Sequence, residues 1–254
     1  MHQIGKISLP RLLMEKLHTI WQTNPFVHRR LSKSIHTWDK LNPDFRHIVL
    51  DDDGIDRFMR SNFDSRTYNA FNSMPLGVMK ADMWRYAAIY VKGGVYADAD
   101  ASCLKPVTTW WNATACPLIV GMENQMHLCQ WTFASVPRHP VLEHVIESIV
   151  RKVEEDGGVD ILKRGDHFVH YYTGPTLFTE AVLRATKQLG VNLLKDLIDT
   201  SHEGVCFRSE DFFRGQNARN FYSSQFLPPK DSWLHQRERL TQMKRSKARQ
   251  HTIS

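Results

Sequence analysis

The chain has 254 residues, a net charge of +6 at neutral pH, a hydrophobic fraction of 42% and four cysteines. This length fits one α/β domain, or a domain with a small appendage, and the composition is that of a soluble globular protein. A core of this size needs no disulfide or structural metal to be stable. The positive charge favours anionic partners, such as nucleotides, phosphorylated lipids, nucleic acid or an acidic membrane, without choosing among them.

Strand and helix patterns alternate through the first third of the chain. Residues 15–23 predict a short strand and the loop after it, and residues 29–41 predict a helix from the spacing of their apolar positions. A second strand is expected at 45–50 and a second helix at 55–62, after an Asp-rich turn that supplies N-cap chemistry. This alternation indicates a parallel sheet with crossover helices.

The next predicted helix has the clearest pattern. Pro75 suits its first turn, and one apolar face follows the helical period through Ala81, Trp84, Ala88 and Val91. Gly93-Gly94 ends the helix, because a left-handed C-terminal turn favours glycine. Residues 95–97 then return as a strand.

The remaining chain predicts strands at 118–122 and 130–135 and helices at 140–153 and 179–189. From position 237 onward the sequence is polar and basic. We therefore divide the chain into a domain of residues 1–236 and a basic C-terminal tail of residues 237–254. The simplest interpretation of the tail is a solvated, frayed end; the alternative is peripheral contact with an anionic membrane.

The four cysteines lack CxxC spacing, which argues against a zinc site, and we expect four buried thiols, with two disulfides as the alternative. Asn112-Ala113-Thr114 is an N-glycosylation sequon, but a three-residue pattern alone does not place a protein in a secretory lumen. No run approaches the ~18 apolar residues of a membrane span, and the first residues lack the apolar core of a signal peptide. These features predict a cytoplasmic protein, with the Golgi lumen as the alternative if an anchoring region precedes this chain.

Asp98 and Asp100 form a pair of carboxylates separated only by the small Ala99. On an extended segment two such side chains point to the same side, and hard oxygen ligands suit Mg²⁺ or Mn²⁺. Two uncompensated carboxylates at the end of a buried strand are costly unless a cation joins them. Without further support, a solvated loop with two acids would be the preferred interpretation.

Support comes from Asp82, sixteen residues before Asp98, and from Arg85, three residues after Asp82. Positions i and i+3 share a helix face. The helix reverses at Gly93-Gly94, so both pairs are expected to converge at the carboxyl ends of the strands, where open α/β sheets bind ligands. There the pair would hydrogen-bond sugar hydroxyls; the alternative is a helical ion pair worth only ~0.3–0.5 kcal/mol.

The run from Lys80 to Pro106 combines Asp, Arg, Gly-Gly, Tyr and DxD at fixed spacing, and it resembles the sugar-binding region of glycosyltransferase family 32. The resemblance continues in residues 18–23, in 119–142, where it points to the fungal initiating α-1,6-mannosyltransferases, in 173–175 and in 232–233. It implies an α/β fold with a GT-A-like, Rossmann-related mixed sheet flanked by helices. It also implies a nucleotide-sugar donor, a divalent metal and retention of anomeric configuration.

The resemblance assigns roles by position. Asp98 would meet donor ribose or sugar hydroxyls and belong to the metal site, and Asp100 would bind the metal that bridges the diphosphate. Asp82 and Arg85 would hold the donor sugar.

Two aromatic residues and the C-terminal segment receive roles in the same way. Trp21 would stack near the base and Tyr96 would line the nucleotide pocket, with ordinary core aromatics as the alternative for both. Related enzymes often carry a histidine before the terminal Gly-Ser-Trp, and this chain has none there, so Asp231 is the candidate third metal ligand, with His235 just beyond it. Trp233 would close over the donor, or else pack in the core.

Four more residues are candidates for the acceptor side: Glu123, His127, Thr173 and Gly174. For Thr173-Gly174-Pro175 an N-cap and turn is an equally good interpretation, since the segment precedes a helix.

These observations predict a metal-dependent retaining glycosyltransferase that moves a hexose, most plausibly mannose from GDP-mannose, to a hydroxyl of a glycan or glycolipid. One alternative is a galactosyl- or glucosyltransferase that uses a UDP-hexose. Another is a catalytically impaired glycan-binding module, because the family's histidine is missing. We expect no nucleic-acid partner, since the positive charge concentrates in the tail instead of forming a stripe with interleaved aromatics.

Overall fold

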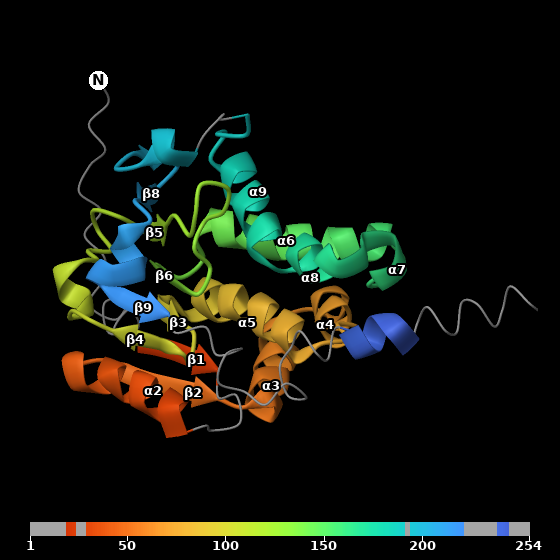
Figure 1. Cartoon of the computed structure of the whole chain (residues 1–254), viewed down its shortest axis with the longest axis horizontal. Coiled ribbons are helices and arrows are strands. Elements are labelled where there is room, and N and C mark those ends of the chain that lie inside the picture. The colour runs from red at the N-terminus through yellow and green to blue at the C-terminus, as the bar shows by residue number, and fades with distance from the viewer. Residues whose placement is uncertain (1–18, 24–28, 191–193, 221–237, 244–254) are drawn as a thin grey trace, which may run out of the picture.

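The computed structural model describes residues 19–23, 29–190, 194–220 and 238–243, which form a mixed β-sheet with helices on both faces (Figure 1). The seven-stranded sheet has the order β2-β1-β3-β6-β5-β8-β7, and β4 pairs with β9 in a separate two-stranded ribbon. The strand bounds are β1 Thr19–Thr23, β2 Arg46–Leu50, β3 Gly94–Ala97, β4 Ala101–Cys103, β5 Leu118–Gly121, β6 Thr132–Ser135, β7 Ser201–His202, β8 Val205–Arg208 and β9 Ala218–Asn220. The predicted mixed sheet flanked by helices is confirmed.

The strand directions define two edges of the sheet. Strand β1 is parallel to β2 and β3, β6 is antiparallel to both β3 and β5, and β5 is parallel to β8. Strands β1, β3, β5 and β8 therefore run in one direction. We call the edge at their C-terminal ends the carboxyl edge and the opposite one the amino edge.

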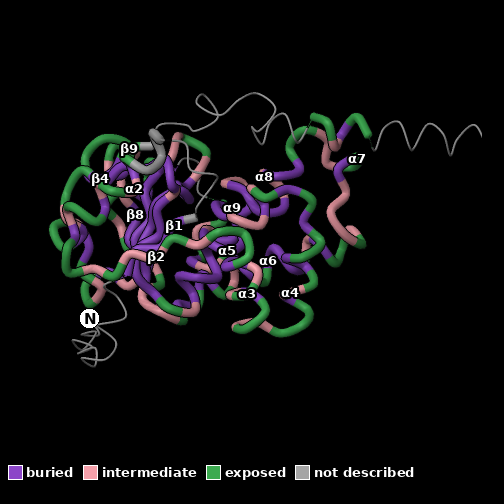
Figure 2. The backbone as a smooth tube through the Cα atoms, turned by 90° about the horizontal axis from the view of Figure 1, so that it is seen from below, coloured by how far each residue is buried: buried purple, intermediate pink, exposed green. Residues whose placement is uncertain are grey.

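Alternation along the strands divides the core into two clusters. One cluster packs under α3 (Asp52–Asn62), α4 (Ser65–Asn72), α5 (Gly77–Lys92), α6 (Pro140–Glu155), α8 (Phe168–Tyr172) and α9 (Pro175–Ala185). The other packs under α2 (Arg29–Leu41) and the β4–β9 ribbon. Neighbours on one strand separate accordingly, as in Ile20 and Trp21 or Val95 and Tyr96, because strand side chains alternate between faces. Figure 2 shows the buried residues concentrated along the strands and α5.

The reversal after α5 follows the prediction. Gly93 has φ 71° and Gly94 φ 100°, and a Cβ at Gly94 would lie 2.3 Å from the carbonyl oxygen of Thr19. Glycine is therefore required there both by the backbone angle and by the close approach of β1. The expected place of Pro75 is wrong: α5 begins at Gly77 after an extended N-cap at Leu76, so the proline precedes the helix.

Other helices differ from expectation as well, and α7 (Ile161–Arg164) and α8 were not predicted. Helix α9 covers residues 175–185 instead of 179–189, because Pro175 takes the first helical position after Gly174. Helix α4 was not predicted, although Asp64 caps it by accepting a hydrogen bond from the Thr67 backbone N–H at 2.8 Å. Its eight residues are too few to show a clear apolar period.

The expectation of four thiols is wrong for one pair. Cys116 and Cys206 form a disulfide with their Cα atoms 5.9 Å apart, whereas Cys103 and Cys129 are buried free thiols. The bond joins the segment before β5 to β8, and these strands are neighbours in the sheet. A residue separation of 90 hides this proximity from the sequence.

Only residues 238–243 of the expected tail region fall within the described part of the chain. They form a helical turn in which Leu240 packs against the larger core cluster. Among the described helices, none combines the length and the apolar character needed to cross a membrane.

Candidate functional site

The Asp98-Ala99-Asp100 segment forms a turn at the carboxyl edge, directly after β3. The Ala101 N–H donates to the Asp98 carbonyl at 2.9 Å and closes the turn, and the Asp98 N–H donates to the Trp131 carbonyl at 2.8 Å. Gln22 at the end of β1 donates from Nε2 to the same Asp98 carbonyl at 3.1 Å. The expectation of an extended segment is therefore wrong, and a hydrogen-bonded turn, not strand alternation, sets the positions of the two carboxylates.

The structure joins Asp98 to both predicted helix residues. Arg85 Nη2 lies 2.9 Å from Asp82 Oδ1 and 3.3 Å from Asp98 Oδ1. The side chains of Arg85 and Asp82 are 5% and 2% exposed, whereas that of Asp98 is 25% exposed. The buried guanidinium of Arg85 thus forms ion pairs with two carboxylates. Of these three side chains, only that of Asp98 reaches the surface.

The pKa values follow from this imbalance. Burial raises the pKa of Asp82 to about 7, although Arg85 and the hydrogen bond from Thr173 oppose the rise. Burial also raises the pKa of Asp98 to about 6, with Arg85 opposing it and the charge of Asp100 adding to it. Burial alone would lower the pKa of Arg85, but Asp98, Tyr96 and Asp82 raise it well above its ordinary value. The arginine stays charged, and a further cation beside the carboxylates would relieve their repulsion.

Tyr96 supports Asp98 from inside the core. Its hydroxyl donates to Asp98 Oδ1 at 2.6 Å, and the Arg85 guanidinium lies 4.9 Å from its ring centroid. The residue is completely buried, so its ring offers no surface to a nucleotide. The expectation that Tyr96 lines a nucleotide pocket is corrected accordingly: it orients the carboxylate.

Trp21 is also a core residue in this structure. It is 6% exposed, its Nε1 donates to the Gly93 carbonyl at 3.0 Å, and its ring meets Phe58 and Trp84 edge-on. Gly93 precedes β3 and therefore lies at the amino edge. The side chain points away from the Asp98 turn, which favours the core alternative for Trp21.

A second layer of polar groups holds Asp82. Thr173 Oγ1 donates to Asp82 Oδ2 at 2.9 Å, and Gln130 Nε2 lies 3.4 Å from Oδ1. The Tyr86 hydroxyl donates to Gln130 Oε1 and also contacts the Thr173 carbonyl at 3.1 Å. No role was predicted from the sequence for Gln130 or Tyr86. Tyr86 lies four residues after Asp82 on α5, so helical spacing could have indicated it, whereas Gln130 is 48 residues away and no local spacing relates it to Asp82.

Thr173-Gly174-Pro175 was expected either to contact the acceptor or to form the N-cap and turn before a helix, and the structure shows what each residue does. The N-cap of α9 is Gly174, which makes no side-chain cap bond, so the hydroxyl of Thr173 is committed to Asp82. A Cβ at Gly174 would lie 2.9 Å from the Cα of His170. Gly174 therefore permits close packing between α8 and α9.

Glu123 and His127 occupy the loop after β5, at the carboxyl edge. Burial and then the charge of Asp98 raise the pKa of Glu123. His127 Nε2 lies 3.2 Å from Thr176 Oγ1, and burial lowers its pKa. Glu123 thus belongs to the same anionic site, while His127 faces the start of α9.

The C-terminal candidates Asp231, Trp233 and His235 lie outside the described residues. Within the described ranges no three His, Cys, Asp or Glu side chains are grouped so as to hold a metal ion. Mg²⁺ and Mn²⁺ do not need such a cage, because Mg²⁺ is usually bound through one or two carboxylates and the phosphates of its substrate. The Asp98 and Asp100 pair, beside a site with surplus negative charge, fits this mode.

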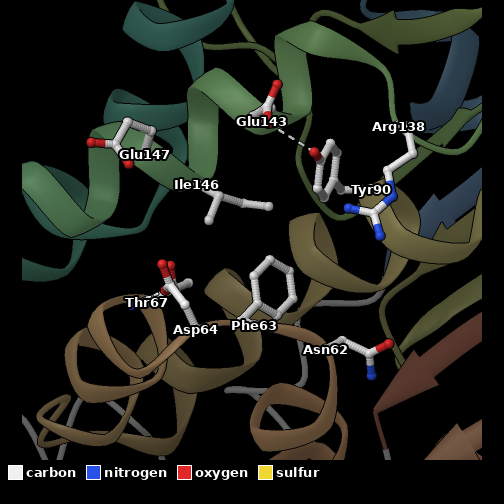
Figure 3. Close-up of a pocket in the computed structure, with 9 residues that line it drawn as sticks. All are labelled: Asn62, Phe63, Asp64, Thr67, Tyr90, Arg138, Glu143, Ile146 and Glu147. Atoms are coloured by element: carbon white, nitrogen blue, oxygen red, sulfur yellow. Dashed lines mark hydrogen bonds between the residues drawn. The ribbon is translucent and has the colours of Figure 1, made fainter.

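A separate cavity of about 250 Å³ lies between the α3–α4 junction on one side and the end of α5 and the first half of α6 on the other (Figure 3). The Tyr90 hydroxyl donates to Glu143 at 2.8 Å on its wall, and the Arg138 guanidinium lies 4.8 Å from the Tyr90 ring centroid. Since α5 ends just before β3, Tyr90 is at the amino edge. This cavity is therefore distinct from the Asp98 turn.

Comparisons with known proteins show which proteins this chain is similar to. Residues 28–116 match a family described as "Glycosyltransferase sugar-binding region containing DXD motif". An initiation-specific alpha-1,6-mannosyltransferase of Schizosaccharomyces pombe is 32% identical over 187 residues, covering 65% of this chain and 47% of that protein. Inositol phosphoceramide mannosyltransferase 1 of the same organism is 29% identical over 145 residues, covering 56% of this chain and 43% of that protein.

Among solved structures, "PaToxG Glycosyltransferase" aligns with a TM-score of 0.49 and 16% identity, covering 70% of this chain and 73% of that one. The chain spans about half the length of the curated relatives it matches. The residues matched by the family include Asp82, Arg85, Asp98 and Asp100.

Proposed function

We propose that this chain is a metal-dependent glycosyltransferase that moves a hexose to a hydroxyl of a glycan, because residues 28–116 match the family of DXD-containing glycosyltransferase sugar-binding regions. The donor that fits best is GDP-mannose, since the curated relatives carry the names of mannosyltransferases. The observation that carries the proposal is the buried Asp82–Arg85–Asp98 network beneath the DxD turn.

This network prepares one face of Asp98 for a ligand. Tyr96 and Arg85 both contact Oδ1, which fixes the plane of the carboxylate from the core side. The partly exposed Asp98 can then present Oδ2 to a donor hydroxyl or to a cation. Rigid positioning of this kind avoids reorganisation when the ligand binds.

The charge balance supports a requirement for a divalent ion. Asp82, Asp98, Asp100 and Glu123 bring four carboxylates to the carboxyl edge, where Arg85 is the buried cation. A nucleoside diphosphate adds more negative charge, which such a site would repel. We propose that Asp98 and Asp100 hold Mn²⁺ or Mg²⁺, with Asp231 as a further candidate ligand. Such an ion supplies Lewis-acid stabilisation of the departing diphosphate.

The remaining residues act by position. Arg85 and Asp82 are buried beneath the turn. They would fix the position of Asp98, against which the donor sugar would bind. Glu123, in the loop after β5 at the same carboxyl edge, is our candidate residue for the acceptor side. By analogy with the family we propose that the anomeric configuration is retained.

A donor panel tests the proposal. Hydrolysis of GDP-mannose and of UDP-hexoses is measured with Mn²⁺ and with EDTA, for the unchanged chain and for Asp100→Asn. We expect metal-dependent turnover of GDP-mannose that falls at least tenfold in Asp100→Asn. Asp44→Asn, at an exposed acid in the turn before β2, is the matched control and should leave turnover unchanged. Turnover that survives EDTA would refute the role of the metal.

Two other outcomes point to the alternatives. Metal-dependent turnover of a UDP-hexose alone would indicate a galactosyl- or glucosyltransferase. Glycan binding without metal-dependent nucleotide-sugar binding in calorimetry would indicate a binding module. The name of the inositol phosphoceramide mannosyltransferase relative makes a glycolipid the second acceptor class to test, and the basic tail would then favour an anionic membrane surface.

A further inference from the structure

We propose that this chain matures in an oxidising secretory compartment and carries an N-linked glycan on Asn112. Two features of one loop support this: the disulfide from Cys116 to Cys206, and a sequon four residues before Cys116. Structural disulfides persist in secreted and lumenal proteins and are rare where thiols are kept reduced. The proposal concerns the fate of the chain and is independent of its proposed catalytic activity.

The sequon lies on the exposed tip of a well-anchored loop. Asn112 and Thr114 are exposed, and no proline follows Asn112 directly. The Asn112 side-chain carbonyl accepts hydrogen bonds from the backbone N–H groups of Thr114 at 3.0 Å and Ala115 at 3.3 Å. Because these bonds use only the side-chain oxygen and the residue is exposed, a glycan on the amide nitrogen can be accommodated.

The anchors on both sides of this tip are buried. Trp111 is 8% exposed and donates from Nε1 to the Cys116 carbonyl at 2.9 Å, and Cys116 is fixed to β8 by the disulfide. The loop therefore presents Asn112 without exposing the core on either side. A sugar attached there would lie outside the packed part of the molecule.

The position relative to the candidate active site is also compatible. The loop precedes β5, so Cys116 lies at the amino edge, whereas Asp98 and Glu123 follow β3 and β5 at the carboxyl edge. The base of the loop at Cys116 therefore lies at the opposite edge from the DxD turn.

Both modifications use chemistry that a secretory compartment supplies. In the first, the two thiols lose two electrons and two protons to a protein disulfide oxidant, and an S–S bond forms. In the second, the amide nitrogen of Asn112 displaces a lipid diphosphate from the anomeric carbon of a lipid-linked oligosaccharide. A C–N bond forms, the C–O bond to the diphosphate breaks, and one amide proton is lost.

Thiol counting tests the disulfide in protein isolated from its source cells. Cys103 and Cys129 are buried, and burial raises the pKa of both thiols, so alkylation of the folded chain should label neither. Unfolding without reductant should expose two reactive thiols, and unfolding with reductant should expose four. Four thiols without reductant would overturn the proposal.

Peptide mapping of the same protein tests the glycan. Digestion with a peptide-N-glycosidase in ¹⁸O water should convert Asn112 to ¹⁸O-labelled aspartate. An unmodified Asn112 in the recovered peptide would overturn the proposal.

A pair of variants in a secretory expression host separates the sequon from the fold. Thr114→Ala should abolish the glycosidase-sensitive mobility shift, and Thr114→Ser, which keeps a hydroxyl, should retain it. Neither change touches the Asn112 side chain, and both variants should unfold at the same urea concentration. A shift that persists in Thr114→Ala would place the glycan elsewhere and refute the assignment to Asn112.

Discussion

Replacing Thr173 with valine tests whether the second layer of polar groups holds the candidate site together. Thr173 is fully buried, and its hydroxyl donates to Asp82 Oδ2 at 2.9 Å, while Asp82 is only 1% exposed. Valine has nearly the same shape, so Thr173→Val removes one hydrogen bond without leaving a cavity. A buried hydrogen bond to a charged group contributes about 1.5–3 kcal/mol, and we expect Thr173→Val to lower the free energy of unfolding by about 2 kcal/mol.

Thr173→Ser is the matched control. It keeps the hydroxyl and removes one methyl group, which costs about 1 kcal/mol of apolar burial. The two variants should therefore differ more in function than in stability. Since the hydrogen bond lowers the pKa of Asp82, its loss in Thr173→Val should leave this carboxylate protonated over a wider pH range and weaken its ion pair with Arg85.

Two assays read these effects. Urea unfolding followed by tryptophan fluorescence gives the stabilities, and calorimetry with GDP-mannose and Mn²⁺ gives donor affinity. We expect donor affinity to fall at least tenfold in Thr173→Val and to stay within threefold of the unchanged chain in Thr173→Ser. Equal stability and equal donor affinity for the two variants would refute the reasoning, because the hydroxyl would then contribute nothing to the site.

Three further changes probe charge, pH and backbone. Arg85→Met leaves two buried carboxylates without their common partner and should cost about 3–5 kcal/mol in urea unfolding at pH 8, and less at pH 5, where the carboxylates become protonated; an equal cost at both pH values would contradict the ion-pair account. Burial lowers the pKa of His139 to about 4, so the neutral ring stabilises the fold fully above its unfolded pKa of 6.5 and this contribution is lost as pH falls toward 4. Between pH 7 and pH 5 the loss should be about 2 kcal/mol and should disappear in His139→Asn, which keeps an N-cap side chain for α6; an unchanged pH profile in the variant would refute it. Gly94→Ala should cost about 3 kcal/mol or prevent folding, since its Cβ would meet the Thr19 carbonyl at 2.3 Å; wild-type stability would show that β1 can move aside.

The elements predicted from sequence were those whose signals are local. Helix α2 was predicted over 29–41 and found there, because its apolar period and the Asn42-Pro43 break lie within one segment. The reversal at Gly93-Gly94 was predicted for the same reason. Helix α4 carries its signal in a single capping residue, Asp64, and a cap without a clear period did not distinguish it from a loop.

The candidate site was predictable only in part. The i, i+3 relation between Asp82 and Arg85 and the carboxylates at the end of β3 are written in one continuous stretch. The contacts that complete the site join residues 48 and 91 positions apart, namely Gln130 and Thr173 with Asp82. Such contacts depend on which strand lies beside β3 and on how α8 packs against α9. The spacing of apolar residues within one segment predicts neither of these arrangements.

At the Asp98 turn the predicted geometry is wrong, although the predicted residues remain the candidate site. Strand alternation would have placed Asp98 and Asp100 on one face, but the Ala101 N–H bond to the Asp98 carbonyl folds the segment into a turn. A turn after a buried strand also leaves the strand's register undisturbed. Its backbone is held by hydrogen bonds to Trp131, Ala101 and Gln22, so the turn supports the carboxylates as firmly as a continued strand would.

The contacts at the amino edge of the sheet stabilise the fold, whereas the carboxyl edge carries the candidate site. At the amino edge the contacts are close-packed or covalent: Gly94 lies against β1, Trp21 donates to Gly93, and the disulfide fixes the start of β5. At the carboxyl edge the same strands end in buried carboxylates that Arg85 neutralises only in part. Each of these carboxylates lowers stability when ionised, because burial raises its pKa. A ligand that supplies positive charge at Asp98 and Asp100 would recover that free energy on binding, so metal affinity should rise with pH between about 5 and 8 as the carboxylates ionise. The rigid amino edge allows the fold to tolerate this cost while the ligand is absent.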